Sequence, residues 1–154
     1  MSVIFLGEVS ESFILSHLSI PLFIESVSAG FPSPAQSYVE QSLDLNELCI
    51  HHPNATFFVR VQGNSMIDAH ILPGDILVVD RTLQAMHGDV VIASVQGEFT
   101  VKQLLTKPTP KLVACNKDYP AIEIIKDMEL EIFGVVRYTI HAVCAPRTKK
   151  SASS

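Results

Sequence analysis

Two residues in this sequence have the side-chain types needed for hydrolysis by a serine and a lysine. Ser65 lies in the stretch 62–66 (QGNSM), directly after an apolar, β-branched segment, and Lys102 lies in the apolar segment 98–105. A serine hydroxyl becomes a nucleophile when a neighbouring base removes its proton, and a neutral amine can be that base. The two residues are therefore candidates for a nucleophile and its general base, although ordinary loop serines and strand-edge lysines have the same types.

The backbone around Ser65 suits a nucleophile. Gly63 and Asn64 tolerate unusual backbone angles, so the chain can turn sharply after the preceding strand. Such a turn leaves backbone N–H groups unpaired near Ser65, where they can face a developing oxyanion.

Lys102 must be neutral to accept a proton. A lysine with an ordinary pKa of ~10.4 is neutral in only about one molecule in 2,500 at pH 7. If 98–104 is a strand, Thr100, Lys102 and Leu104 share one face. A lysine between leucine and threonine, rather than among carboxylates, can lose its hydration, which lowers its pKa. The Thr100 hydroxyl could also hydrogen-bond the neutral amine and help to aim it.

Other chemistries have weaker support in the sequence. His70 and His87 could serve Ser65 as a base, but both lie in turns without an evident orienting partner. Cys49 stands close to two histidines, yet no second Cys/His pair follows at zinc spacing, so we expect no metal or other cofactor. Four aspartates occur in turns, where such side chains bond the nearby backbone: Asp68, Asp75, Asp80 and Asp89.

Composition limits the class of protein. The 154 residues are 47% hydrophobic and 18% charged, which fits one folded domain rather than a disordered chain. The net charge is −5, and the only basic cluster is in the polar end at 147–150, so direct sequence-specific DNA binding is not expected. Three widely spaced cysteines do not form a disulfide framework, which favours a reducing compartment such as the cytoplasm.

Residues 1–29 are apolar but do not fit a membrane anchor or a signal peptide. Three glutamates and Pro21 interrupt them, no apolar run reaches the ~18 residues of a membrane span, and no basic segment comes first. We interpret them as an amphipathic arm of a soluble protein. The arm ends in Val27-Ser28-Ala29-Gly30, a small-residue junction that resembles a cleavage site.

The rest of the chain divides into a linker at 30–37, a domain over 38–143 and a polar tail at 144–154. Residues 34–50 predict a short helix or helical turns, and a mainly β domain follows from several short, β-branched stretches with turn residues between them. The predicted strands fall within 56–63, 73–80, 87–105, 111–115, 121–125 and 130–143, with a hairpin turn at Gln96-Gly97 in the third.

Four motifs in this order resemble UmuD and its plasmid-borne relatives, which share a self-cleaving domain with LexA-type repressors. They are G-x-S-M-x-D at 63–68, P-G-D at 73–75, H-G-D at 87–89 and E-F-T-V-K at 98–102. The similar segments cover most of residues 28–143. The resemblance implies a mainly β, single peptidase domain of short twisted strands with an extended N-terminal arm.

The resemblance also implies roles for individual residues. Ser65 matches the nucleophile and Lys102 the general base of the family, with backbone N–H groups of Asn64 and Ser65 as the oxyanion hole. The family cuts its own arm at a small-residue–glycine bond, which corresponds to Ala29-Gly30 here. Small residues there let the chain enter a narrow cleft, and Val27 is an apolar anchor two residues before Ala29.

By the same resemblance we expect an SOS-response protein of the bacterial cytoplasm. It would form a homodimer, cut itself when stimulated by a RecA–single-stranded DNA filament, and then act with a UmuC-type Y-family polymerase in error-prone translesion synthesis. Only 29 residues precede the expected cleavage bond, which argues against the helix-turn-helix domain of a repressor. Two alternatives remain: a non-catalytic polymerase-interaction module with an unused site, and a processing peptidase that acts on other chains.

Overall fold

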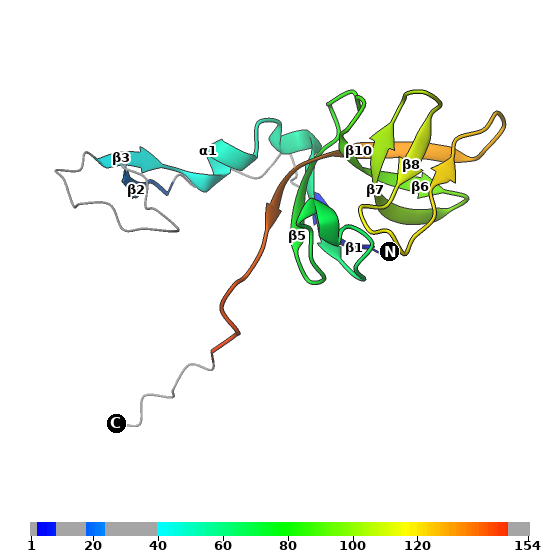
Figure 1. The fold of residues 1–154 in the computed structure, drawn as a ribbon. Helices are drawn as coiled ribbons and strands as arrows, with labels where there is room; N and C mark the ends of the chain where they lie inside the picture. The colour runs from blue at the N-terminus through cyan, green and yellow to red at the C-terminus, as the bar shows by residue number, and fades with distance from the viewer. Residues whose placement is uncertain (1–2, 9–17, 24–39, 148–154) are drawn as a thin grey trace.

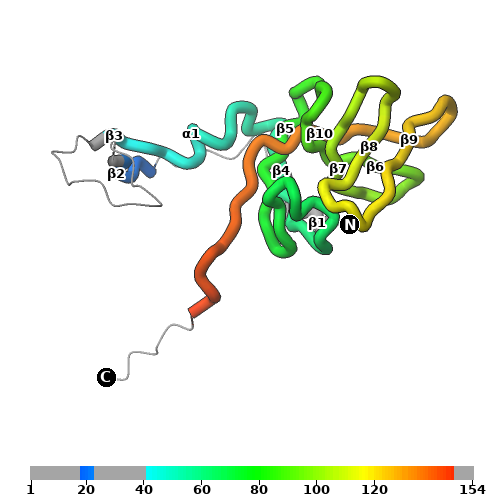
Figure 2. The backbone as a smooth tube through the Cα atoms, in the orientation of Figure 1, coloured from blue at the N-terminus to red at the C-terminus, as the bar shows by residue number. Residues whose placement is uncertain are grey.

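The computed structural model describes residues 3–8, 18–23 and 40–147, and in this part of the chain the main feature is one eight-stranded antiparallel sheet (Figures 1 and 2). The order across the sheet is β1-β4-β5-β10-β6-β7-β8-β9. The strands are β1 (Val3–Glu8), β4 (Thr56–Val61), β5 (Ile76–Asp80), β6 (Val90–Val95), β7 (Glu98–Leu105), β8 (Lys111–Val113), β9 (Ile122–Glu123) and β10 (Leu130–Ile140). The mainly β fold predicted from the sequence is confirmed.

A second, two-stranded ribbon and a short helix lie to one side of this sheet in Figure 1. The ribbon pairs β2 (Ile20–Phe23) with β3 (Glu40–Leu43), and α1 (Leu45–Cys49) follows β3 directly. The buried carboxylate of Asp44 joins them, because it accepts hydrogen bonds from the Leu18 N–H at 3.1 Å and from the Asn46 N–H at 2.8 Å. Two 3₁₀ turns, η1 (Pro53–Ala55) and η2 (Ile67–Ala69), complete the described elements. None of the helices described is long and apolar enough to cross a membrane.

The helix predicted over 34–50 is shorter than expected. Residues 45–49 are helical, but 40–43 form a strand that pairs with residues 20–23, and 34–39 lie outside the described residues, as does the whole linker 30–37. The local pattern of apolar residues fitted a helix, and a long-range strand partner from the N-terminal arm overrode it. The arm also contributes β1 to the main sheet, which its amphipathic pattern did not predict.

Each stretch of the sequence predicted to hold a strand after residue 50 contains one. The hairpin predicted at Gln96-Gly97 joins β6 to β7, and both turn residues have positive φ, at 50° and 83°. Two consecutive positive φ angles match the right-handed twist of a tight antiparallel hairpin, and glycine adopts such an angle without strain.

Apolar side chains from both faces of the central strands form the core. Within β6, Val91 and Ala93 belong to one cluster and Ile92 to the other, so both faces of this strand are covered. The first cluster comprises Phe57, Val59, Val61, Met66, Ile71, Leu77, Val79, Ile92 and Val101. The second comprises Val91, Ala93, Leu104, Leu112 and Val135. The cores therefore depend on residues that follow position 56.

Gly134 allows β10 to pass close to β5. It lies at a register shift in β10, and a Cβ atom added there would be 2.7 Å from Val79 Cγ1 and 2.9 Å from the Asp80 carbonyl oxygen. We expect Gly134→Ala to lower the free energy of unfolding by about 1–3 kcal/mol, the usual cost of overpacking. Urea denaturation measures the change, and the exposed neighbour Glu131→Ala serves as control. Equal stability of the two variants would contradict this close approach.

Candidate active site

Ser65 lies in the turn between β4 and η2. Gly63 makes the turn possible, because its φ of 80° lies in the left-handed region that larger side chains rarely adopt. The next residue, Met66, is fully buried in the first core cluster and anchors the turn to the sheet. Ser65 itself is also fully buried, so its hydroxyl faces the protein interior rather than solvent.

Lys102 comes from the middle of β7, where it pairs with Val91 of β6. Only 5% of its surface is exposed, which is unusual for a lysine. Thr100 and Leu104, two positions away on either side, are also buried, as predicted for one shared face. Strand β7 therefore places a lysine, a residue that is usually charged, in a largely apolar interior.

The structure brings the two residues together across 37 positions of sequence. The Nζ of Lys102 lies 3.4 Å from the Oγ of Ser65 and 3.3 Å from the carbonyl oxygen of Val101. Among the described residues, Lys102 has no carboxylate partner that would hold it charged. A hydrogen bond from Thr100 to the amine is not seen there either, so the supporting role of Thr100 stays a prediction.

Burial lowers the pKa of Lys102 below its ordinary value. The cause is the loss of hydration, which disfavours the charged ammonium. The thiol of Cys115 acts in the opposite direction, since a thiolate nearby would favour the ammonium. Burial in turn raises the pKa of Cys115, with a further rise from Asp68, so the thiol is held in its neutral form. Burial therefore shifts Lys102 toward the neutral amine, the form that a general base requires.

Asn116 holds the turn that carries Ser65. This buried residue lies in the loop between β8 and β9, and its Nδ2 donates to the Asn64 carbonyl at 2.9 Å. Its Oδ1 accepts from the Asp118 N–H at 3.0 Å, which fixes which way the side-chain amide points. Tyr119 from the same loop donates its hydroxyl hydrogen to Asn64 Oδ1 at 2.7 Å. Both the backbone and the side chain of Asn64 are therefore clamped.

This clamp sets the direction of the Ser65 N–H. In a trans peptide the carbonyl and the following N–H point in opposite directions, so fixing the Asn64 carbonyl also fixes the Ser65 N–H. Within the described part of the chain, no backbone carbonyl accepts a hydrogen bond from this N–H. An oriented donor beside the hydroxyl is the geometry that an oxyanion hole requires.

The sequence alone did not indicate Asn116 or Tyr119. Residues 116–119 (NKDY) have the polar composition of any surface turn, and nothing in their spacing relates them to Ser65. Only the pairing of β7 with β8 brings this loop to the serine.

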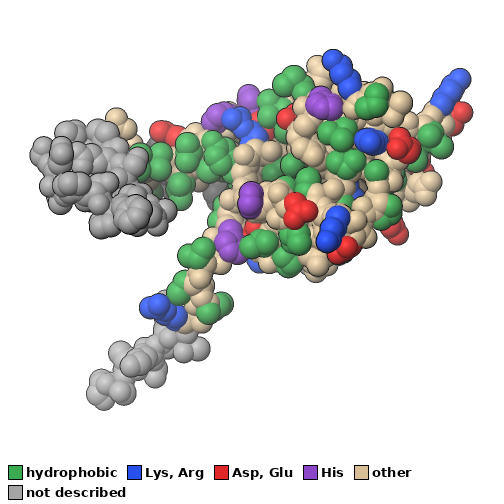
Figure 3. Space-filling model, viewed as in Figure 1, with side chains coloured by type: hydrophobic (Ala, Val, Ile, Leu, Met, Phe, Trp, Pro, Cys, Tyr) green, Lys and Arg blue, Asp and Glu red, His purple; other side chains and the backbone are tan. Residues whose placement is uncertain are grey.

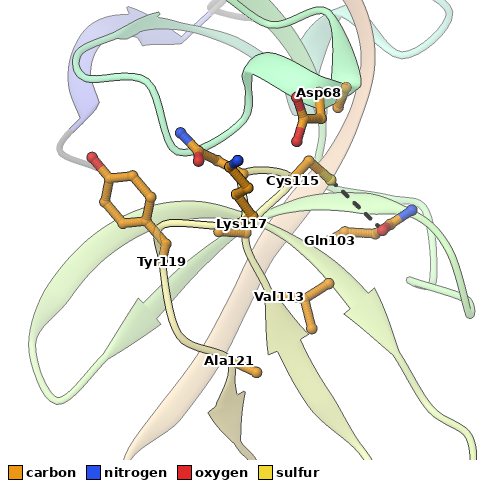
Figure 4. A pocket seen from close by; sticks show the side chains of 10 residues that line it. Asp68, Gln103, Val113, Cys115, Lys117, Tyr119 and Ala121 are labelled. Atoms are coloured by element: carbon orange, nitrogen blue, oxygen red, sulfur yellow. Dashed lines mark hydrogen bonds between the residues drawn. The ribbon is translucent and has the colours of Figure 1, made fainter.

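Tyr119 lines two pockets. The smaller, of about 340 Å³, is lined by Lys102 together with apolar side chains that include Val95, Phe99 and Ile122. The larger, of about 600 Å³, is shown in Figure 4 and is lined by neither Ser65 nor Lys102. Its walls include Asp68, Gln103, Lys117 and Cys115, whose Sγ donates to Gln103 Oε1 at 3.7 Å. Lys102 lines the smaller pocket, whereas Ser65 lines neither pocket.

Four of the other candidates for chemistry hydrogen-bond backbone groups. The His87 ring accepts a hydrogen bond from the Thr106 N–H at 2.9 Å, and neither it nor His70 contacts Ser65 in the described residues. Three aspartates bond the nearby backbone, as predicted for turn acids: Asp75 accepts from Leu72 N–H, Asp80 from Thr82 N–H and Asp89 from Met86 N–H. Val27, Ala29 and Gly30 lie outside the described residues.

Fold and site together define a β-rich domain with a buried serine–lysine pair, and comparison with known proteins agrees. The Peptidase S24-like family matches residues 21–137. Protein MucA of Salmonella typhimurium is 53% identical over 129 residues, which cover 82% of this chain and 88% of MucA. Protein ImpA of Shigella flexneri is 51% identical over 121 residues, covering 79% of this chain and 83% of ImpA. LexA repressor 1 of Pseudomonas syringae pv. tomato is 40% identical over 119 residues, 76% of this chain and 58% of the repressor.

The chain belongs to the peptidase S24 family. Within this family it is a UmuD-like, self-cleaving serine peptidase of SOS mutagenesis. The family expected from the four sequence motifs is therefore confirmed.

The clamp on Asn64 leads to a prediction about rate. We expect Asn116→Ala to slow self-cleavage about 10- to 100-fold, because a small misplacement of a catalytic group is costly. The midpoint of the pH–rate profile should not move, since the surroundings of the Lys102 amine are unchanged. Self-cleavage followed by electrophoresis from pH 7 to 10 measures both quantities. The exposed neighbour Lys117→Ala is the control, and a shifted midpoint in Asn116→Ala would show that Asn116 acts through the lysine instead.

Proposed function

We propose that this protein cuts its own chain between Ala29 and Gly30, with Ser65 as nucleophile and Lys102 as general base. The observation that carries the proposal is the buried amine 3.4 Å from a fully buried hydroxyl. A buried hydroxyl beside a desolvated amine, which has no carboxylate partner among the described residues, has the arrangement of a nucleophile with its base.

The reaction begins when neutral Lys102 takes the proton of Ser65. Ser65 Oγ then attacks the Ala29 carbonyl carbon, and the Ser65 and Asn64 N–H groups stabilise the oxyanion. Loss of one such donor typically costs about 3 kcal/mol of barrier. The Lys102 ammonium returns the proton to the Gly30 nitrogen as the peptide bond breaks. Water, deprotonated by Lys102, hydrolyses the acyl-enzyme and releases residues 1–29.

The pocket lined by Lys102 suits this substrate. Three of its lining residues, Val95, Phe99 and Ile122, are apolar and fit an apolar side chain such as Val27. The small side chain of Ala29 and the absence of one at Gly30 let the scissile bond approach the buried amine. The arm reaches this position in only a fraction of molecules, and binding of a RecA–single-stranded DNA filament raises that fraction.

The cleaved form then acts with a UmuC-type Y-family polymerase in translesion synthesis, and the protein works as a homodimer in the bacterial cytoplasm. Its similarity to MucA and ImpA supports these partners. An apolar pocket of about 440 Å³ between α1 and the end of β10, with Ile140 53% exposed in its wall, is a surface that a second copy could cover. All three cysteines are free thiols, which suits a reducing compartment.

Contact with DNA through the RecA filament, rather than directly, agrees with the charge of the surface. The net charge is −5. On the face shown in Figure 3, lysines and arginines are scattered among acidic side chains instead of forming a patch. Direct binding to duplex DNA needs clustered positive charge to neutralise phosphates.

Self-cleavage can be tested by incubating the protein with RecA, single-stranded DNA and a nucleotide, and weighing the products. We expect a fragment that begins at Gly30 with wild type and with the surface control Lys117→Ala. Ser65→Ala and Lys102→Ala should give none. Without RecA, the rate should rise with pH and level off below pH 10.5, the ordinary lysine pKa, because burial lowers the pKa of Lys102.

Two outcomes would contradict this assignment. A rate that stays flat between pH 7 and 10 would exclude Lys102 as the base. A wild-type chain that stays uncut both with RecA and at alkaline pH would leave a non-catalytic interaction module.

A further inference from the structure

We propose that self-cleavage uncovers β4 as a free sheet edge, and that an extended segment of the polymerase partner then pairs with it. This inference rests on the proposed cleavage after Ala29 and adds to it the surface that cleavage creates. Cleavage would thereby change which backbone groups are available for strand pairing, and not only the length of the chain.

The sheet order places the arm at the edge. β1 (Val3–Glu8) is the outermost strand and pairs only with β4, from Val3 opposite Val61 to Glu8 opposite Phe57. β5 occupies the other side of β4. Because β1 lies within residues 1–29, cleavage after Ala29 cuts it from the chain that holds β4.

Cleavage also weakens the pairing of β1 with β4. While residues 9–55 join the two strands, β1 is present at a high effective concentration, of the order of millimolar for flexible connections. After cleavage the same pairing of five residue pairs becomes bimolecular, and the strand dissociates at micromolar protein concentration. A register shift between Phe5 and Gly7 interrupts the pairing and weakens it further.

The exposed edge is suited to strand addition. A bare edge strand presents a row of unpaired N–H and C=O groups that a second extended chain can satisfy. β4 has six residues, whereas β9 at the opposite edge has only two, so β4 is the better template. The natural occupant shows the chemistry required, because the stretch 3–7 (VIFLG) is extended, apolar and uncharged.

Two copies of the cleaved protein are poorer partners for each other at this edge. Each has lost the segment that pairs with β4. Arg60 of β4 pairs with the uncharged Ile4 of β1, so the edge accepts an added apolar strand such as the one that cleavage removes. The partner that is engaged after cleavage, the polymerase, is therefore the occupant to which we assign the edge.

The cleaved domain should stay folded without the arm, since the two core clusters lie between Phe57 and Val136. Hydrogen exchange can then compare the self-cleaved product with uncut Ser65→Ala. We expect the β4 amides that face β1 to exchange at least tenfold faster in the product, while the β6 amides keep their rates. Equal protection of β4 in both forms would overturn the proposal.

Binding of the partner is tested with the purified UmuC-type polymerase and a peptide of residues 2–10. The polymerase should bind the product at least tenfold more tightly than uncut Ser65→Ala. The peptide should compete with it, and a peptide with Ile4→Pro and Phe5→Pro should not, because proline lacks the N–H needed for pairing. The assignment would be overturned if neither peptide reduced polymerase binding. It would also be overturned if the peptide of residues 2–10 displaced a second copy of the cleaved protein but not the polymerase.

A protein that fails to cut itself does not block this test. A chain that starts at Gly30 supplies the same product directly, so failure of self-cleavage and failure of strand addition give different results. The chain that starts at Gly30 can show fast hydrogen exchange of the β4 amides and polymerase binding that the peptide of residues 2–10 reduces. Strand addition at β4 is then confirmed even when wild type stays uncut.

Discussion

The burial of one lysine amine against one serine hydroxyl is the constraint on which this active site depends. A lysine in contact with water is charged at neutral pH and cannot accept a proton. Here β7 carries Lys102 into the interior, where the loss of hydration lowers its pKa. The same burial shields Ser65 from solvent, which agrees with the small residues at the cleavage bond that we propose. Chemistry and substrate choice thus have a common physical origin.

The antiparallel sheet supplies this constraint through long-range pairing. β4 leads into the Ser65 turn, and β7 is separated from it by three intervening strands in the sheet order. The fully buried Met66 anchors the turn in the core. Asn116 and Tyr119, from the loop between β8 and β9, hydrogen-bond Asn64. Three separate segments therefore position one hydroxyl, one amine and one N–H. Such a preorganised arrangement does not have to rearrange when negative charge develops on the substrate.

Much of this arrangement could be predicted from the sequence, because it is encoded locally. Alternating β-branched residues indicated the strands, Gln96-Gly97 indicated the hairpin, and the motif around Ser65 with the apolar stretch around Lys102 indicated the chemistry. The clamp by Asn116 could not be predicted, since its role arises from a loop that reaches Ser65 only in the folded sheet. The strand at 40–43 was mistaken for part of a helix for a similar reason: its partner, β2, lies about 20 residues away in the arm.

The most direct test of the central claim is the pKa of the Lys102 amine itself. In Ser65→Ala, which stays intact, the ¹³Cε and ¹⁵Nζ shifts of Lys102 can be followed by NMR from pH 6 to 11, with the exposed Lys117 as internal reference. A buried, substrate-ready base predicts a Lys102 pKa clearly below that of Lys117. A Lys102 pKa equal to or above that of Lys117 would mean that the amine is charged beside Ser65, and this would contradict its role as general base.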